Sequence, residues 1–207
     1  LMSKSVENNL RNYNFHKLYK ELLNFCTLDL SSFYFDIRKD VLYCDSIKSE
    51  KRKNCVVVLN ILLESLLKWF APILVFTTDE VYSLVNKDEK NIHEYSFVKV
   101  PKNWKNDELN NKWEKLFKIK QEANIAIEAK RSSKEIGSSL EADLKIQISQ
   151  KLKNLTENIN FSELCITSKA EVDYKDDIDI IAITSKAKGT KCPVCWKIND
   201  GPCPRHP

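Results

Sequence analysis

The residues whose types and spacing are best suited to metal binding or reaction lie in the last 16 positions of this 207-residue sequence. Cys192 and Cys195 form one pair with two residues between them, and Cys203 and His206 form a second pair with the same spacing. Thiolates and a neutral imidazole suit tetrahedral Zn²⁺, and two intervening residues let a tight turn bring both side chains of a pair to one ion. The spacing predicts a zinc knuckle with these four residues as ligands.

Two other interpretations of the cysteines remain open. A Cys-x-x-Cys pair can be a thiol–disulfide site when its first thiolate lies at a helix N-terminus. Such a site would leave Cys203 and His206 without a role, and the Trp that usually precedes the first Cys is absent, since Trp196 follows the second. The third interpretation is a vestigial or incomplete metal site.

Cations surround the one aromatic residue of this tail. Trp196 lies among Lys191, Lys197 and Arg205, and residues 186–207 carry four Lys and one Arg against one Asp, which equals the whole net charge of +4. An aromatic ring beside cations can stack on an unpaired base while the charges contact phosphates, which predicts single-stranded RNA binding. Alternatively, the indole packs against its own metal loop and the charges are simply solvated.

The composition narrows the class of protein. With 43% hydrophobic and 30% charged residues, a chain of this length can bury a core, so wholesale disorder is excluded. Its apolar runs are too short or too charged for a membrane span, and no signal peptide is visible, so we expect a cytoplasmic protein. Seven Cys is an odd number and indicates reduced thiols plus a metal site. The four outside the tail are expected to be small buried side chains: Cys26, Cys44, Cys55 and Cys165.

The hydrophobic pattern predicts mainly helical structure before the tail. Apolar residues recur at helical spacing over 3–28, 51–70 and 107–131, and a further buried segment covers 72–85. We expect a bent connector or short extended piece over 33–43 and a loop over 86–104.

After Gly137 the spacing of the apolar residues becomes shorter than a helical period. Short β-branched or alternating runs at 144–148, 164–168 and 178–184 predict strands, and 151–158 could form a helix. The expected organisation is a helical bundle over 1–136, a small α/β subdomain over 137–188 and a zinc-binding tail over 189–207. Because the sequence begins with Leu1, we expect it to be a piece of a longer chain, truncated before the bundle.

Several long runs carry a family resemblance. One of them is DLSSFYFDIRKDVLYCD at 29–45. The others, which occur in the order found in the family, are YNFHKLYKELLNFC at 13–26, LKWFAPILVFTTDEV at 67–81, AIEAKRSSKEIGSSLEA at 126–142, LCITSKAEV at 164–172 and KCPVCW at 191–196. By these runs the sequence resembles bacterial isoleucyl-tRNA synthetases over nearly its whole length.

The resemblance implies a class I synthetase-type anticodon-binding helical bundle, followed by a small α/β part and a zinc-bearing end that reaches the anticodon loop. It implies isoleucine tRNA as the partner and structural zinc as the cofactor. The full-length family attaches isoleucine to this tRNA using ATP, in a catalytic domain that this sequence lacks together with the editing domain. We therefore expect tRNA binding without catalytic residues, in a monomeric enzyme that does not enter membranes.

The tail departs from the family pattern, in which a longer loop separates two Cys-x-x-Cys pairs. Either this lineage has a shortened site that uses His206 as fourth ligand, or the ordinary second pair is lost and Cys203 is incidental. Arg38 and Lys39 lie in the matched run at 29–45 and could contact tRNA, or they could form ion pairs with Asp36 and Asp40. The rival function is a non-catalytic helical protein-interaction module with a zinc ribbon, which predicts no tRNA preference.

Overall fold

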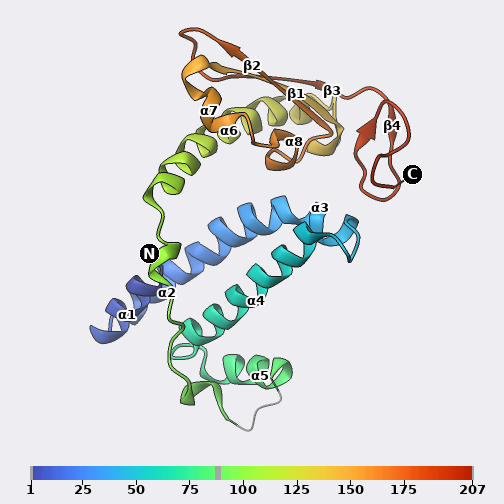
Figure 1. The fold of residues 1–207 in the computed structure, drawn as a ribbon. Coiled ribbons are helices and arrows are strands. Elements are labelled where there is room, and N and C mark those ends of the chain that lie inside the picture. The colour runs from blue at the N-terminus through green and yellow to red at the C-terminus, as the bar shows by residue number, and fades with distance from the viewer. Residues whose placement is uncertain (1, 87–89, 207) are drawn as a thin grey trace. The chain divides into compact units, whose positions relative to one another are not determined.

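The computed structural model describes residues 2–86 and 90–206, so Leu1, on which the expected truncation depends, lies outside the described residues. The chain forms two compact units, Leu1–Lys105 and Asn106–Pro207, which we describe separately. The first is helical and the second combines a long helix with small sheets (Figure 1). A mainly helical fold with a small sheet region therefore agrees with the sequence analysis.

The first unit is built from five α-helices, a π-helix and two short 3₁₀ turns within its described residues. They are α1 (Met2–Arg11), α2 (Phe15–Asn24), the π-helix η1 (Phe25–Phe35), α3 (Asp36–Cys44), α4 (Glu50–Phe70), α5 (Val75–Val85), η2 (Ile92–Glu94) and η3 (Lys102–Trp104). Figure 1 shows α2, η1 and α3 following one another as a continuous rod, with α4 returning beside it. The helix predicted at 51–70 is confirmed. In the loop predicted at 86–104, residues 86 and 90–104 form neither α-helix nor strand and contain the 3₁₀ turns η2 and η3, while residues 87–89 lie outside the described residues.

The single long helix predicted over 3–28 is wrong, because α1 ends at Arg11. Tyr13 adopts a left-handed conformation with φ 56°. Its N–H donates to the Leu10 carbonyl at 3.1 Å and the Asn14 N–H donates to the Asn9 carbonyl at 2.8 Å, which is the Schellman pattern that ends helices. Glycine usually occupies this position, so with Tyr13 the end of the helix has no visible stop signal in the sequence.

The bent connector or short extended piece predicted over 33–43 is also wrong. These residues complete η1 and form α3, in which Ile37 and Val41 are both buried. Their spacing of four places both side chains on one helical face. The alternation of Phe33, Phe35 and Ile37 with the residues between them spans too few positions to distinguish an extended segment from a helix.

Two clusters form the core of the first unit. Val6, Leu18, Leu22 and Trp69 join α1, α2 and the end of α4. A second cluster joins α4, α5 and η2 through Leu67, Ala71, Tyr82 and Ile92. Tertiary burial of these faces, rather than helix propensity alone, holds the shorter helices in place.

The second unit begins with a long helix and continues through a three-stranded sheet to a terminal hairpin. Its elements are α6 (Asp107–Ser132), η4 (Ser139–Glu141), β1 (Ala142–Ser149), η5 (Gln150–Leu152), α7 (Lys153–Thr156), α8 (Phe161–Leu164), β2 (Lys169–Lys175), β3 (Ile181–Lys186), β4 (Thr190–Lys191) and β5 (Ile198–Asn199). Strand β1 lies between β2, to which it is parallel, and β3, to which it is antiparallel.

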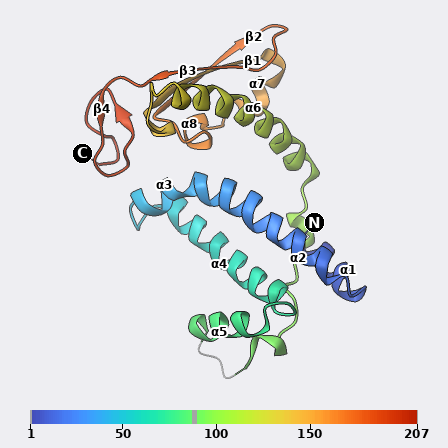
Figure 2. The ribbon, with the colours of Figure 1, turned by 180° about the vertical axis from the view of Figure 1, so that it is seen from behind.

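The helix α6 covers one face of this sheet (Figure 2). One stripe of α6 is buried and consists of Leu116, Ile119, Ala123 and Ile127. In β1 every second residue is buried, namely Ala142, Leu144, Ile146 and Ile148. Lys120 Nζ also donates to the Leu164 carbonyl at 2.7 Å. The compact units therefore divide before α6, whereas the sequence placed a break after residue 136, since a helical period does not show which neighbour the helix packs against.

The predicted strand at 144–148 and the helix at 107–131 are confirmed. The strand predicted at 164–168 is wrong, because α8 ends there and Ile166 adopts φ 57° in a turn before β2. The strand predicted at 178–184 begins later, at Ile181, and the helix predicted at 151–158 is reduced to η5 and α7. Within residues 2–86 and 90–206, no helix combines the length and the apolarity needed to cross a bilayer.

Candidate metal centre and nucleic-acid interface

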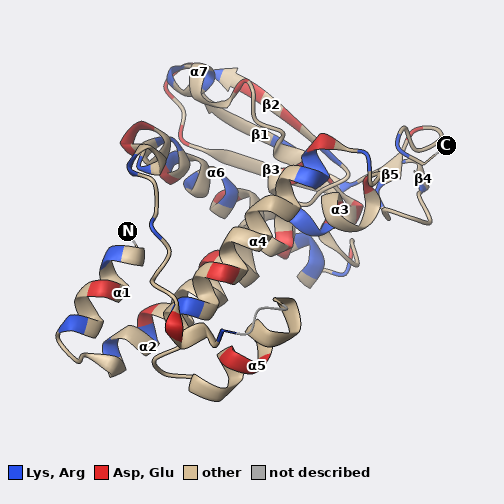
Figure 3. Ribbon diagram, turned by 60° about the horizontal axis from the view of Figure 1, so that its bottom comes forward, with Lys and Arg blue, Asp and Glu red and all other residues tan. Residues whose placement is uncertain are grey.

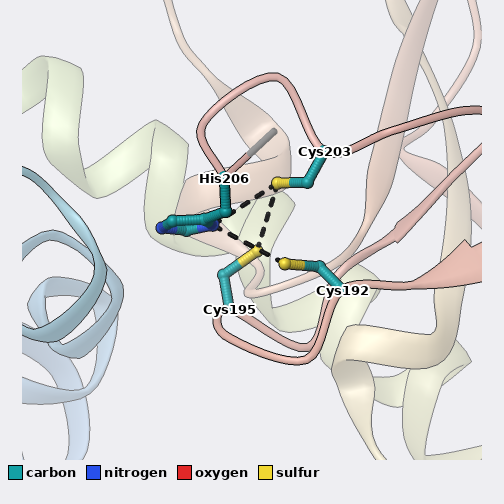
Figure 4. A group of neighbouring side chains, drawn as sticks. All are labelled: Cys192, Cys195, Cys203 and His206. Carbon is teal, nitrogen blue, oxygen red and sulfur yellow. Dashed lines mark hydrogen bonds between the residues drawn. The ribbon is translucent and has the colours of Figure 1, made fainter.

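The four predicted ligands lie together. Figure 4 shows the three sulfurs and the imidazole of the set Cys192, Cys195, Cys203 and His206 turned toward one another. All four ligand atoms lie within 4.8 Å of one another. Cys192 and Cys195 are buried, while Cys203 and His206 are half-buried.

The distances between these atoms fit a tetrahedral zinc site. Cys195 Sγ lies 3.8 Å from Cys203 Sγ, and His206 Nδ1 lies 3.6 Å from Cys192 Sγ and 3.5 Å from Cys203 Sγ. With usual zinc–ligand bond lengths, tetrahedral geometry separates two sulfurs by about 3.8 Å and a sulfur from a nitrogen by about 3.6 Å. The donor set and its spacing therefore agree with a closed four-ligand site.

The two halves of the site have the same local architecture. Each is a Cys-Pro turn in which the cysteine sulfur accepts hydrogen bonds from backbone N–H groups two and three residues later. The N–H groups of Cys195 and Val194 lower the pKa of Cys192 to about 6. In the second turn the N–H of Arg205, followed by the imidazole of His206, lowers the pKa of Cys203. Such donors favour the thiolate form that binds metal.

Cys195 differs from the other two thiols. Burial raises its pKa to about 11, although the N–H of Lys197 acts in the opposite direction. A coordinating metal ion deprotonates a thiol outright. Binding a cation here would therefore release the Cys195 proton, and the three thiolates would become ligands of one centre.

A short hairpin presents the first turn. We call residues 189–206 the metal hairpin; its strands β4 and β5 pair with Thr190 opposite Asn199 and Lys191 opposite Ile198. Gly189 adopts φ 125°, and a Cβ built on it would lie 2.1 Å from the Asn199 carbonyl oxygen. A glycine is therefore required where the hairpin begins.

Three contacts attach the metal hairpin to the sheet. The Ile198 N–H donates to Ser168 Oγ at 2.6 Å, Lys169 Nζ contacts both carboxylate oxygens of Asp200 at 2.6 Å, and Lys191 Nζ lies 3.5 Å from Glu141 Oε1. Sequence analysis missed Ser168, Asp200 and Glu141. No local signal marks them, because each contact joins segments about 30 or more residues apart.

Trp196 lies on the surface of the metal hairpin. It is 60% exposed, so the indole does not fold back under the metal loop. Its backbone has φ 64°, its N–H donates to the Cys192 carbonyl at 3.0 Å, and the Cys192 N–H donates to the Lys197 carbonyl at 2.9 Å. The left-handed conformation is thus held by the same turn that carries the first two ligands.

The predicted cations of the tail lie on the same hairpin. Lys191 and Arg205 are exposed and Lys197 is half-buried. Figure 3 shows Lys and Arg on this part of the chain. Lys191 also pairs with Glu141, whose pKa is lowered chiefly by the hydrogen bond from the Gly137 N–H.

The other two predicted contact residues belong to the first unit. Lys39 Nζ lies 2.9 Å from Asp36 Oδ1, and the Arg38 guanidinium lies 5.9 Å from the centre of the Tyr34 ring. Lys39 therefore forms one of the ion pairs proposed as the alternative to tRNA contact. An exposed ion pair of this kind contributes little and can exchange for a phosphate contact.

All seven cysteines are free thiols. Cys55 and Cys165 are buried as predicted, and burial raises the pKa of Cys165 to about 11. Cys26 and Cys44 are half-buried, so the prediction that they are buried is wrong. Both lie on the rod formed by α2, η1 and α3, where a cysteine side chain can point partly away from the core.

Comparison with known proteins agrees with this architecture. A family model described as the anticodon-binding domain of tRNA ligase matches residues 2–148, which include the first unit, α6 and most of β1. The isoleucine–tRNA ligase of Pelagibacter ubique is 58% identical over 205 residues, covering 99% of this chain and 23% of that protein. The isoleucine–tRNA ligases of Agrobacterium fabrum and Gluconobacter oxydans are 35% and 36% identical, over 100% and 87% of this chain.

The chain spans 23% of the length of the first two of these relatives and 19% of the third. The family match covers more than half of the chain and includes the helical core in which Leu18, Leu22 and Trp69 meet. The protein therefore belongs to the family of anticodon-binding domains of tRNA ligases.

Proposed function

We propose that this chain binds the anticodon stem-loop of an isoleucine tRNA, as part of an isoleucine–tRNA ligase. The observation that carries the proposal is the 58% identity to the Pelagibacter ubique isoleucine–tRNA ligase over 99% of the chain. The family match over residues 2–148 supports an anticodon-binding role independently of that name. Attachment of isoleucine to tRNA with ATP is proposed only for the whole enzyme. We propose that this enzyme is a cytoplasmic monomer and that its anticodon-binding bundle is of the class I synthetase type.

By function rather than by compact unit, the proposed domain organisation has an anticodon-binding bundle over 1–136, a small α/β part over 137–188 and a zinc-binding tail over 189–207. The zinc is structural. Cys192, Cys195, Cys203 and His206 would hold it, and four protein ligands leave no position for a reactive water. The lengths of the S···S and S···N contacts support this assignment. They favour a shortened site that uses His206 over a site in which Cys203 is incidental.

The RNA-contacting residues of the tail are proposed to be Trp196, Lys191, Lys197 and Arg205. The exposed indole would stack on an anticodon base, and the cations would contact the backbone phosphates. Contacts with the bases carry sequence information, whereas phosphate contacts contribute affinity and register without it. Arg38 and Lys39 are proposed as further backbone contacts from the first unit.

The test is binding of the zinc-loaded chain to an isoleucine tRNA transcript and to the same transcript with its anticodon bases replaced, each at low and moderate salt. We expect a preference for the native anticodon that persists when salt is raised, because base contacts are less screened than phosphate contacts. Equal and strongly salt-sensitive binding of both transcripts would contradict anticodon reading. No measurable binding of either would favour the rival protein-interaction module with a zinc ribbon.

A further inference from the structure

One of the three contacts between the metal hairpin and the sheet is made by a hydroxyl group. Ser168 lies in the turn just before β2, and its Oγ donates to the Leu140 carbonyl while accepting the Ile198 N–H at 2.6 Å. The Ser168 N–H also donates to the Ala142 carbonyl at 3.1 Å, which fixes the backbone of this residue. The hydroxyl therefore has its single proton committed to one segment and a lone pair committed to another.

The neighbouring residue strengthens the same attachment. Lys169 Nζ lies 2.6 Å from both carboxylate oxygens of Asp200, directly after β5. On the other strand of the metal hairpin, Lys191 contacts Glu141, which follows Leu140. The two strands of the hairpin are thus held at one corner of the sheet, formed by residues 140–142 and 168–169.

The hairpin cannot set its own orientation. Its strands contain two residues each, and a two-stranded hairpin of that size is marginal by itself. A metal ion fixes the turns relative to each other but makes no bond to the sheet. Ile198 is 7% exposed, so its N–H needs a partner inside the protein, and Ser168 provides it.

We propose that Ser168 is a positioning residue for RNA recognition: its hydroxyl fixes β5, and thereby Trp196 two residues earlier, in the orientation that reads the anticodon. This inference rests on the proposed function and adds to it a residue that touches neither metal nor RNA. A displaced indole no longer holds an anticodon base in one fixed place for base-specific contacts, whereas Lys and Arg on a loosened hairpin still attract phosphates. Loss of the hydroxyl therefore lowers selectivity more than total affinity.

The experiment compares the wild-type chain with Ser168→Ala and Ser168→Thr, loaded with zinc, using Ser185→Ala in exposed β3 as the matched control. The first readout is hydrogen exchange of the Ile198 amide, which needs no RNA. The second is the ratio of affinities for transcripts with native and replaced anticodons. The third is zinc content, which confirms that the metal site itself is intact in each variant.

In Ser168→Ala we expect Ile198 exchange to rise by about 10-fold or more, since a buried donor loses its acceptor. The affinity ratio should fall toward one while binding at low salt and zinc content are retained, and Ser168→Thr should restore both readouts. Unchanged Ile198 exchange would overturn the attachment. Faster exchange with an unchanged affinity ratio would overturn the positioning role. Absence of anticodon preference in the wild-type chain would instead contradict the proposed function, and with it the positioning role of Ser168. Hydrogen exchange of the Ile198 amide would still decide whether Ser168 attaches the metal hairpin.

Discussion

Cys195 Sγ lies 3.8 Å from Cys203 Sγ, although eight residues separate the two cysteines in the chain. The contact joins the two Cys-Pro turns. Each turn brings its own pair of ligands together locally, so this distance and the one from Cys192 Sγ to His206 Nδ1 report whether the halves form one site. Their agreement with tetrahedral edges supports a metal centre over two separate turns.

Replacing Cys192 by Ser should remove the metal. The wild-type chain, purified without chelators, should contain about one zinc ion, because four soft donors saturate a structural site. Cys192→Ser should contain almost none when measured by elemental mass spectrometry. Cys44→Ser, a half-buried cysteine of the first unit, is the matched control and should keep its zinc. Metal-free wild-type protein, or zinc retained in Cys192→Ser, would refute the site.

The two glycines of the metal hairpin should respond differently to alanine. Gly189→Ala places a methyl group 2.1 Å from the Asn199 carbonyl oxygen at φ 125°, whereas the Cβ of Gly201→Ala meets nothing within 4 Å. We expect Gly189→Ala to cost about 1–3 kcal/mol in hairpin stability and to lower zinc affinity in a chelator competition assay. Gly201→Ala should stay within about 0.5 kcal/mol of wild type. Equal effects of the two substitutions would show that β4 and β5 do not pair as described.

Removing the exposed indole of Trp196 should weaken tRNA binding. One lost stacking contact is worth about 1–3 kcal/mol, or roughly 5- to 150-fold in affinity. Trp104→Ala is the matched control, since Trp104 is 56% exposed against 60% for Trp196 but lies in the first unit, outside the metal hairpin. The measurement is transcript binding at moderate salt, with circular dichroism to check folding. Equal losses in both variants would exclude a specific role for Trp196.

Replacing Tyr13 by Gly should stabilise the first unit. Tyr13 holds φ 56° and is 80% exposed, so glycine relieves the left-handed strain at little cost in packing. We expect a gain of up to about 1 kcal/mol in the free energy of unfolding, measured by urea denaturation. Tyr19→Gly, inside α2, should instead destabilise by about that amount or more. A loss of stability in Tyr13→Gly would mean that its ring contact with Phe15 outweighs the backbone strain.

The metal cluster and the long helices could be predicted from the sequence because both depend on local spacing. Two ligands three positions apart meet through one turn, and α4 and α6 have apolar residues at helical periods over many turns. The breaks could not be predicted in the same way. Tyr13, Lys134 and Ile166 all adopt left-handed conformations at helix ends, where glycine would have been the visible signal, and the chain has three glycines in all.

The division between compact units depended on information that periodicity does not contain. The apolar stripe of α6 shows that this helix is covered on one side, and only the structure shows that β1 and β3 of the sheet cover it. The attachment of the metal hairpin is non-local in the same sense. Ser168 and Ile198 are 30 positions apart, and neither residue type at its position indicates the other.

The paired Cys-Pro turns have a consequence for how the metal is captured. Each turn is a bidentate chelator in which backbone N–H groups donate to the sulfur of the first cysteine. A zinc ion can therefore be held by one turn first, and the second turn then binds at a high effective concentration across a seven-residue tether. Acquisition in two steps would make release slow even where each half alone exchanges its ion rapidly.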